Sequence, residues 1–433
     1  MTPRPLSRRQ FLVGLGVAGS AAAAAGYGWS VWGPDDGATT RRAVVGRVAP
    51  PTLGGRADRT LVVLELGGGN DGLSTIVPYA DPAYAKLRPT LGVKDPIVLD
   101  GSIGLHPKLV TVADRFKKGQ VAIVEGVGYP NPDLSHFASL ATLWAGAPGQ
   151  SGAGWLGRYL DGTVGFDDPL AAVGIAPVPS PALAGDASFA TTIADTTGLQ
   201  PALAPRTGTA TDLFGAWGKL VPAHPGDASL LGEVQRAIAL TIDARADLDA
   251  ALQPGATGSG PTDDLLVARG GQTGPVAAAL GLAAQLVASA HPPRVIYVGG
   301  LGDYDTHQGQ AARHPTLMAD LDAGIAAFFA KLDAAHATDR ALVMTVSEFG
   351  RRAAENGSGT DHGTAAPHLL IGSQVKGGRY GAPPSLAALD SHGNVAMTTD
   401  FRVLYATALQ GWLGVDAAAV LGPGFAPLPI VTG

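Results

Sequence analysis

The sequence predicts an α/β fold with a mostly parallel central sheet sandwiched by helices, and a cap or insertion in the middle of the chain. Two observations lead to this prediction. Short apolar runs, several of them rich in β-branched residues, alternate with longer amphipathic segments, as in parallel sheets covered on both faces. Polar and glycine-rich segments follow several of these runs directly, which is where open α/β sheets bind ligands.

Five short apolar runs are the expected strands: Thr60–Leu66, Gln120–Glu125, Arg294–Val298, Leu342–Val346 and His368–Ile371. Runs of this length, bounded by turn or polar residues, are typical of buried strands. Amphipathic segments between the runs are the expected helices: Pro107–Lys118, His136–Trp144, Leu230–Leu252, Gly274–Ser289, Pro315–Leu332 and Asp400–Leu413. In the second of these, Phe137, Leu140, Leu143 and Trp144 recur at helical spacing and are expected to face the core.

Composition excludes several classes of function. The chain has 433 residues, 46% of them hydrophobic, so it is long enough for one large core or two ordinary ones. The net charge of −6 and the lack of a basic stripe argue against a nucleic-acid partner. Cysteine is absent, which removes every thiolate ligand or nucleophile.

The N-terminal residues are typical of a signal peptide. Arg8 and Arg9 precede a weakly hydrophobic run rich in Gly and Ala, which predicts a twin-arginine signal over residues 1–32. The expected partner is the twin-arginine export machinery, and the expected location is periplasmic, cell-envelope or secreted. The run from Phe11 to Trp32 is just long enough to span a bilayer, so a membrane association is expected only if the signal is retained as an anchor.

Behind the signal we expect a linker over residues 33–58 and one α/β domain over residues 59–433. The linker is polar, contains Gly and Pro, and is basic in places. Residues 162–273 are rich in Pro, Gly and Ala and poor in predicted strands, so this stretch is the expected cap or insertion.

Asp and His residues gather in the loops that follow the predicted strands. Asp305 and His307 follow Arg294–Val298, Glu348 follows Leu342–Val346, and the pair Asp361 and His362 comes in the next loop. Carboxylate oxygens and neutral imidazoles together are ligands for zinc, manganese and other divalent ions. One divalent metal, with zinc, manganese or calcium as candidates, is therefore the expected cofactor. The alternative is that these residues only cap helices and stabilise turns.

Ser135 lies between a predicted strand and a predicted helix. It is placed either as an N-cap or as a nucleophile presented at the helix start, where the helix dipole stabilises an oxyanion. The glycines of Gly67–Gly72 do not make a dinucleotide site, because their spacing differs from GxGxxG and no acidic residue follows at the required distance.

Several motifs resemble a known bacterial family, domain of unknown function 1501. They include LELGGGNDGLSTIVPYADPAYAKLRPTL, GLHPKL, GWLGRYL, DYDTHQGQAARH, SEFGRRAAEN and GTDHGTAAPHLLIG, and together they cover most of the predicted domain. The family typically carries a twin-arginine signal, and its own activity is not established. The resemblance implies a fold like that of alkaline phosphatases and sulfatases, which use a Ser or Thr nucleophile and two divalent metals held by Asp and His.

By the same resemblance, Ser135 matches the nucleophile region, Asp305 and His307 match an Asp/His ligand pair, and His362 matches a final histidine ligand. Asp71 is the carboxylate nearest to the ligand expected after the first strand. The chain departs from the pattern at Phe349, where a ligand histidine is expected, and at Glu348, which replaces an aspartate. One metal site is therefore expected to be impaired.

Two functions remain open at this point. The first is an exported, metal-assisted hydrolase of phosphate or sulfate esters, in which a metal activates Ser135 or a water molecule. The second is a non-catalytic binding protein that keeps the fold and binds an unknown ligand of the cell envelope. Metal content separates the two, and the sequence does not identify the substrate.

Overall fold

The computed structural model describes residues 53–147, 152–165, 168–188, 190–193, 219, 230–252 and 274–432. The expected signal peptide and most of the expected linker lie outside these residues. Leu53 and Arg56, at the end of the expected linker, already donate main-chain hydrogen bonds to Gly162 and Leu413. Within the described ranges, no helix is both long and apolar enough to cross a membrane.

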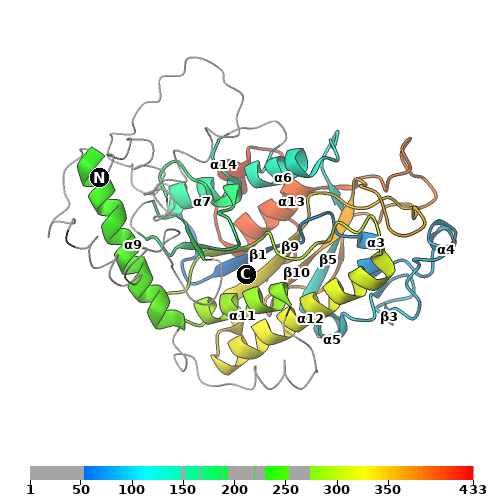
Figure 1. Cartoon of the computed structure of the whole chain (residues 1–433), viewed down its shortest axis with the longest axis horizontal. Coiled ribbons are helices and arrows are strands. Elements are labelled where there is room, and N and C mark those ends of the chain that lie inside the picture. The colour runs from blue at the N-terminus through cyan, green and yellow to red at the C-terminus, as the bar shows by residue number, and fades with distance from the viewer. Residues whose placement is uncertain are drawn as a thin grey trace, which may run out of the picture.

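A nine-stranded sheet forms the centre of the molecule, in the order β11-β5-β10-β9-β1-β8-β6-β7, with β12 pairing with β5 (Figure 1). Its strands are β1 (Thr60–Glu65), β5 (Val121–Gly128), β6 (Ala172–Ile175), β7 (Thr191–Ile193), β8 (Val295–Val298), β9 (Ala341–Val346), β10 (Ala366–Ile371), β11 (Gly378–Tyr380) and β12 (Thr399–Asp400). Every strand pair is parallel except the two that β10 makes with β5 and β9. The prediction of a mostly parallel sheet is therefore confirmed.

All five expected strands are present. The sheet also contains β6 and β7, which fall inside the range 162–273 and extend the sheet beyond β8. The helix α9 (Leu230–Leu252) lies in the same range, at the predicted residues. Most of the remaining residues of this range are outside the described part, so the expected cap or insertion stays a prediction.

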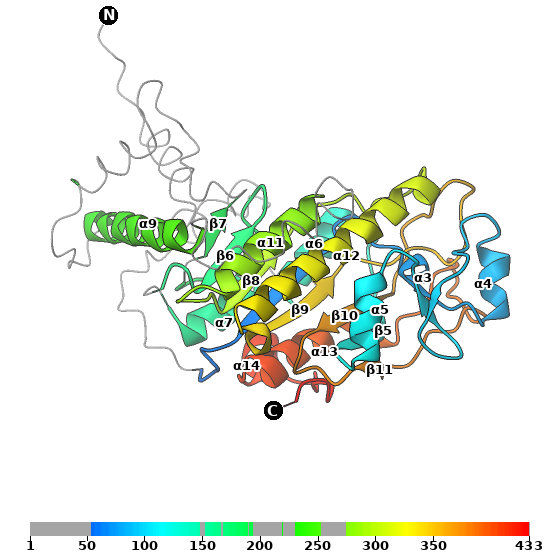
Figure 2. The ribbon, with the colours of Figure 1, turned by 90° about the horizontal axis from the view of Figure 1, so that it is seen from below.

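Helices cover both faces of the sheet (Figure 2). One face is covered by α5 (Val110–Lys117), α11 (Pro275–Val287) and α12 (Gln310–Ala334), and the other by α6 (His136–Ala145), α7 (Trp155–Thr163), α13 (Phe401–Ala406) and α14 (Ala417–Leu421). Because strand residues alternate in direction, Val62 and Leu64 pack in the first layer while Leu61 and Val63 pack in the second.

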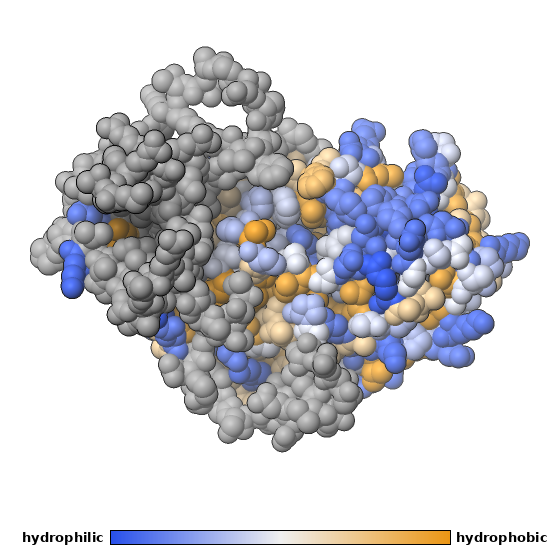
Figure 3. All heavy atoms as spheres, viewed as in Figure 1, coloured by the Kyte–Doolittle hydropathy of each residue, from blue (hydrophilic) through white to orange (hydrophobic). Residues whose placement is uncertain are grey.

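Smaller elements complete one end of the molecule. The short helices α3 (Gly72–Thr75) and α4 (Pro82–Leu87) lie near a second sheet of order β2-β4-β3, made of Ile76–Val77, Gly104–Leu105 and Ile97–Val98. Hydrophilic residues gather at this end on the face seen in Figure 3. This end also carries the loops that build the site described next.

Two sequence expectations are wrong in detail. The helix expected from Pro315 starts at Gln310, and Pro315 lies inside it. Phe137, expected in the core, is 84% exposed. Successive helical residues point about 100° apart, so the start of α6 that directs His136 inward directs Phe137 toward solvent.

Candidate metal centre

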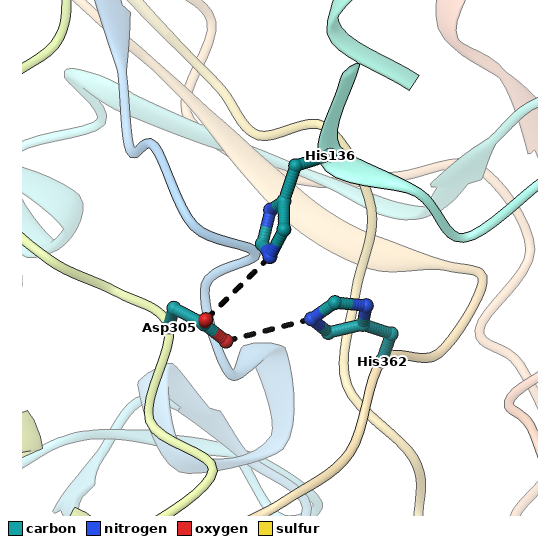
Figure 4. A group of neighbouring side chains, drawn as sticks. All are labelled: His136, Asp305 and His362. Atoms are coloured by element: carbon teal, nitrogen blue, oxygen red, sulfur yellow. Dashed lines mark ion pairs between the residues drawn. The ribbon is translucent and has the colours of Figure 1, made fainter. Parts of the chain in front are cut away.

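Three loops at the carboxyl edge of the sheet bring one side chain each to a common point (Figure 4). His136 begins α6 after β5, Asp305 lies in the loop after β8, and His362 lies in the loop between β9 and β10. One ligand atom from each lies within 4.8 Å of the others. In the described part of the chain, this is the group of His and carboxylate side chains with the spacing of a metal site.

Asp305 is at the centre of this group. Its Oδ2 lies 3.5 Å from Nε2 of His136. Its Oδ1 lies 3.3 Å from Nε2 of His307 and 3.4 Å from Nε2 of His362. The two Nε2 atoms of His307 and His362 are themselves only 2.9 Å apart. Three imidazoles therefore direct the same ring nitrogen toward one carboxylate.

The opposite nitrogen, Nδ1, of each imidazole faces an oxygen acceptor. Nδ1 of His136 lies 2.9 Å from Oε1 of Glu348, and Nδ1 of His307 lies 3.1 Å from Oδ1 of Asp361. Nδ1 of His362 lies 2.8 Å from the carbonyl oxygen of Leu134. Because these oxygens can accept, they favour the tautomer with the proton on Nδ1, in which Nε2 carries a lone pair.

This tautomer pattern fits a cation. The Nε2 atoms of His307 and His362, 2.9 Å apart, can share a proton in a hydrogen bond, or both can direct a lone pair at a cation beside them. At zinc and similar ions, a histidine usually binds the metal through one ring nitrogen and donates the N–H of the other to a carboxylate or carbonyl oxygen. The donor set of two imidazoles and one carboxylate within 4.8 Å, with His307 adjacent, suits zinc or manganese.

A buried arginine fixes the central carboxylate. Arg351, whose side chain is fully buried, places Nη2 2.5 Å from Oδ1 of Asp305 and also donates to the carbonyl oxygens of Gly69 and Thr360. Burial by itself would raise the pKa of Asp305, but the Arg351 hydrogen bond and charge outweigh burial and lower it. Asp305 is therefore ionised at neutral pH, and its Oδ2 is directed toward His136.

The backbone and an aromatic ring shape the same site. Leu134 has a φ of 62°, a strained conformation for a bulky residue, and its carbonyl oxygen contacts His362. The ring of Phe349 packs 4.3 Å from the ring of His362 and 5.0 Å from that of His136. Burial lowers the pKa of His362, which keeps it neutral and able to bind a metal.

The structure brings most of the expected site residues together. Asp305, His307 and His362 lie in the cluster together with His136. Glu348 contacts Nδ1 of His136, and Asp361 contacts Nδ1 of His307. Ser135 is the N-cap residue of α6, but its side chain makes no capping hydrogen bond.

Asp71 is not part of the cluster. Its carboxylate is fully buried and pairs with Arg88 at distances of 2.6 and 3.0 Å. It also accepts hydrogen bonds from Ser74 and Gln310. Both of its oxygens are thus occupied by protein donors.

Sequence reasoning did not assign His136 to the site. It is adjacent to Ser135 and at the start of a predicted helix, but a single sequence does not show which of two neighbours points inward. Arg351 was also not assigned, although it lies in the segment SEFGRR after a predicted strand. For His136 the available signal was its position at the start of a predicted helix, and for Arg351 its position in the segment that follows a strand.

A family model described as "Protein of unknown function (DUF1501)" matches residues 119–422, which include every member of the cluster. No protein of curated function matches the chain in sequence.

Solved structures with some similarity include hydrolases, at low identity. A protein in the alkaline phosphatase superfamily from Vibrio parahaemolyticus is 9% identical with a TM-score of 0.29, covering 76% of this chain and 64% of its own length. A sulfatase from Pseudoalteromonas sp. is 11% identical with a TM-score of 0.35, covering 86% and 71%. The alkaline phosphatase of the Antarctic bacterium TAB5 is 11% identical with a TM-score of 0.28, covering 73% and 92%. At these scores the similarity carries no argument about function.

Proposed function

We propose that this chain, which belongs to the DUF1501 family, is an exported, metal-assisted hydrolase of phosphate or sulfate esters. The observation that carries the proposal is the convergence of three Nε2 atoms on Asp305. In this arrangement His136, His362 and Asp305 would hold one divalent ion, with His307 beside them. Glu348 and Asp361 would orient two of the imidazoles.

A bound divalent ion would polarise an ester oxygen and lower the pKa of a coordinated water molecule. The chain's own groups prepare the site for this chemistry. Arg351 holds Asp305 ionised and fixed. Ser135 precedes His136 at the N-terminus of α6, where the partial positive charge of the helix favours an anionic group. Since its hydroxyl is not used for capping, Ser135 is available as a nucleophile.

The surroundings favour one ion over two. Asp71, the carboxylate nearest to the ligand expected after the first strand, has both oxygens bound by protein donors. Phe349 places a ring against His136 and His362 where the resemblance leads one to expect a histidine ligand. A single-ion site is also compatible with the second candidate, a non-catalytic binding protein of the cell envelope. Turnover by the metal-loaded protein distinguishes these two functions.

Export through the twin-arginine machinery is part of the proposal and rests on the residues around Arg8 and Arg9. The substrate would then be an ester in the periplasm, the envelope or the medium. A membrane association belongs to the proposal only if the signal is retained as an anchor.

Calorimetric titration of the chelator-stripped protein with zinc, manganese and calcium tests the metal site. We expect saturable binding of one ion, and its loss in His136→Ala and His362→Ala. His392→Ala is the matched control, because this histidine is exposed and its hydrogen bonds among the described residues are with Ser391 and Asp390. Absence of saturable binding for all three ions by the folded protein would refute the proposal.

Hydrolysis assays test catalysis separately. The metal-loaded protein should release nitrophenol from p-nitrophenyl phosphate or p-nitrophenyl sulfate, and Ser135→Ala should lose this activity while still binding metal. Metal binding without turnover of either ester would favour the non-catalytic binding protein.

A further inference from the structure

A small cavity of about 10 Å³ lies behind the metal centre. It is lined on its polar side by Ser347, Glu348 and His368, and on its apolar side by residues that include Tyr129, Phe401 and Tyr405. This volume is at the lower limit of the space that one water molecule requires. Glu348 borders both the cavity and His136, so the cavity adjoins the group that orients a proposed metal ligand.

His368 contributes a polar atom that no protein group satisfies. The residue is on β10, its exposed fraction is only 4%, and its Nδ1 has no hydrogen-bond partner among the described residues. Burial lowers the pKa of His368 to about 4, so the ring is neutral at pH 7. A buried polar nitrogen without a partner is costly, and ordered water is its usual partner when no protein group is in reach.

Glu348 also has an incompletely used oxygen. Its Oε1 accepts from the main-chain N–H of Gly68 at 2.7 Å and faces Nδ1 of His136 at 2.9 Å. Its Oε2 has only the hydroxyl of Ser347, at 3.4 Å. That hydroxyl lies closer to the carbonyl oxygen of Leu66, at 2.9 Å, and has a single proton to donate. Oε2 therefore lacks a well-placed donor among the described residues, and Glu348 lines the cavity.

We propose that one water molecule binds in this cavity and bridges His368 to Oε2 of Glu348. The water satisfies both groups and holds the carboxylate in the position that fixes Nδ1 of His136. His368 is thus a positioning residue that acts on the metal centre through a water molecule and Glu348. Its effect on metal binding rests on the proposed function, whereas the water site itself does not.

The direct test is a high-resolution crystal structure of the wild-type protein. A water within hydrogen-bond distance of His368 and of Oε2 of Glu348 supports the proposal. A cavity that is empty at a resolution where neighbouring buried waters are seen overturns it. This measurement does not depend on whether the protein binds metal.

The functional test compares His368→Leu with His368→Asn. Leucine removes the polar atom, whereas the asparagine side chain places an amide near the position of Nδ1. We expect His368→Leu to weaken zinc binding by about 10- to 100-fold, as outer-shell changes do, and His368→Asn to restore most of the affinity. Equal zinc affinity in wild type and His368→Leu would overturn the positioning role.

A second readout does not require metal. Nitrogen-15 chemical shifts of the His136 ring in the metal-free protein report its tautomer. We expect a single Nδ1–H tautomer in wild type and in His368→Asn, and a mixture in His368→Leu. If wild type binds no zinc, the proposed function fails while this comparison still decides the role of His368, and an unchanged tautomer in His368→Leu would then contradict it.

Discussion

Replacing Asp71 by Asn tests whether this residue is structural, as its contacts indicate, or a metal ligand, as its place in the sequence suggests. Asp71 and Arg88 are both fully buried and share two hydrogen bonds. The substitution keeps the shape of the side chain but removes its charge. Arg88 is then left as a buried cation whose remaining contacts include the carbonyl oxygens of Ala353 and Arg352.

We expect Asp71→Asn to lower the free energy of unfolding by about 3–5 kcal/mol at pH 7, the usual cost of removing one partner of a buried ion pair. Adding Arg88→Met removes the stranded charge and should recover part of this loss. Zinc affinity should stay within about twofold of wild type, because the Asp71 carboxylate is not directed at the cluster.

The effect depends on pH in a definite direction. Burial alone would raise the pKa of Asp71, but the charge and hydrogen bonds of Arg88 lower it below its ordinary value. A carboxyl group with a lowered folded-state pKa contributes stability above its unfolded pKa of about 3.9 and loses that contribution as the pH falls through the folded value. The difference in stability between wild type and Asp71→Asn should therefore be full at pH 7 and shrink below about pH 4.

Urea denaturation followed by tryptophan fluorescence measures the stability difference, and calorimetry measures zinc affinity. Two results would refute the reasoning. A loss of stability below about 1 kcal/mol at pH 7 would show that the ion pair is not a major buried interaction. A loss of zinc binding with stability unchanged would show that Asp71 is a metal ligand after all.

Three further outcomes are expected. Replacing Arg8 and Arg9 together by Lys should leave the protein in the cytoplasm, and normal export measured by cell fractionation would contradict the twin-arginine assignment. Zinc affinity measured by calorimetry should fall at acidic pH, because protonated imidazole does not bind metal and burial holds the pKa of His362 below its ordinary value, and His362→Ala should abolish most binding at every pH. Trp144→Phe should destabilise the protein by about 1–3 kcal/mol in urea denaturation, because it removes the indole N–H donated to Glu65 at 3.0 Å.

Hydrophobic pattern alone predicted most of the secondary structure. The five predicted strands are all present, and the expected helix Leu230–Leu252 has the predicted bounds. Hydrophobic residues recur every two residues in a half-buried strand and about every 3.6 residues in an amphipathic helix. These patterns lie within one segment, so they predict its secondary structure without knowledge of the fold. The pattern did not predict β6 and β7, since these short strands lie in a stretch rich in Pro, Gly and Ala.

The convergence of the site was also predictable, because the carboxyl ends of parallel strands meet at one edge of a sheet. This placed Asp305, His307 and His362 in one region before any contact was known. The direction of β10 was not predictable, since an isolated apolar run does not specify whether its neighbours run parallel or antiparallel to it.

Only the tertiary structure decided the roles within the site. Ser135 and His136 are adjacent in sequence, yet the imidazole of His136 enters the cluster. Asp71 follows a strand just as Asp305 does, but Arg88 occupies its carboxylate. The physical reason is that the direction and partner of a polar side chain depend on groups far away in the chain. Residue type and spacing therefore identified the ligands that were available, and only packing determined which of them meet.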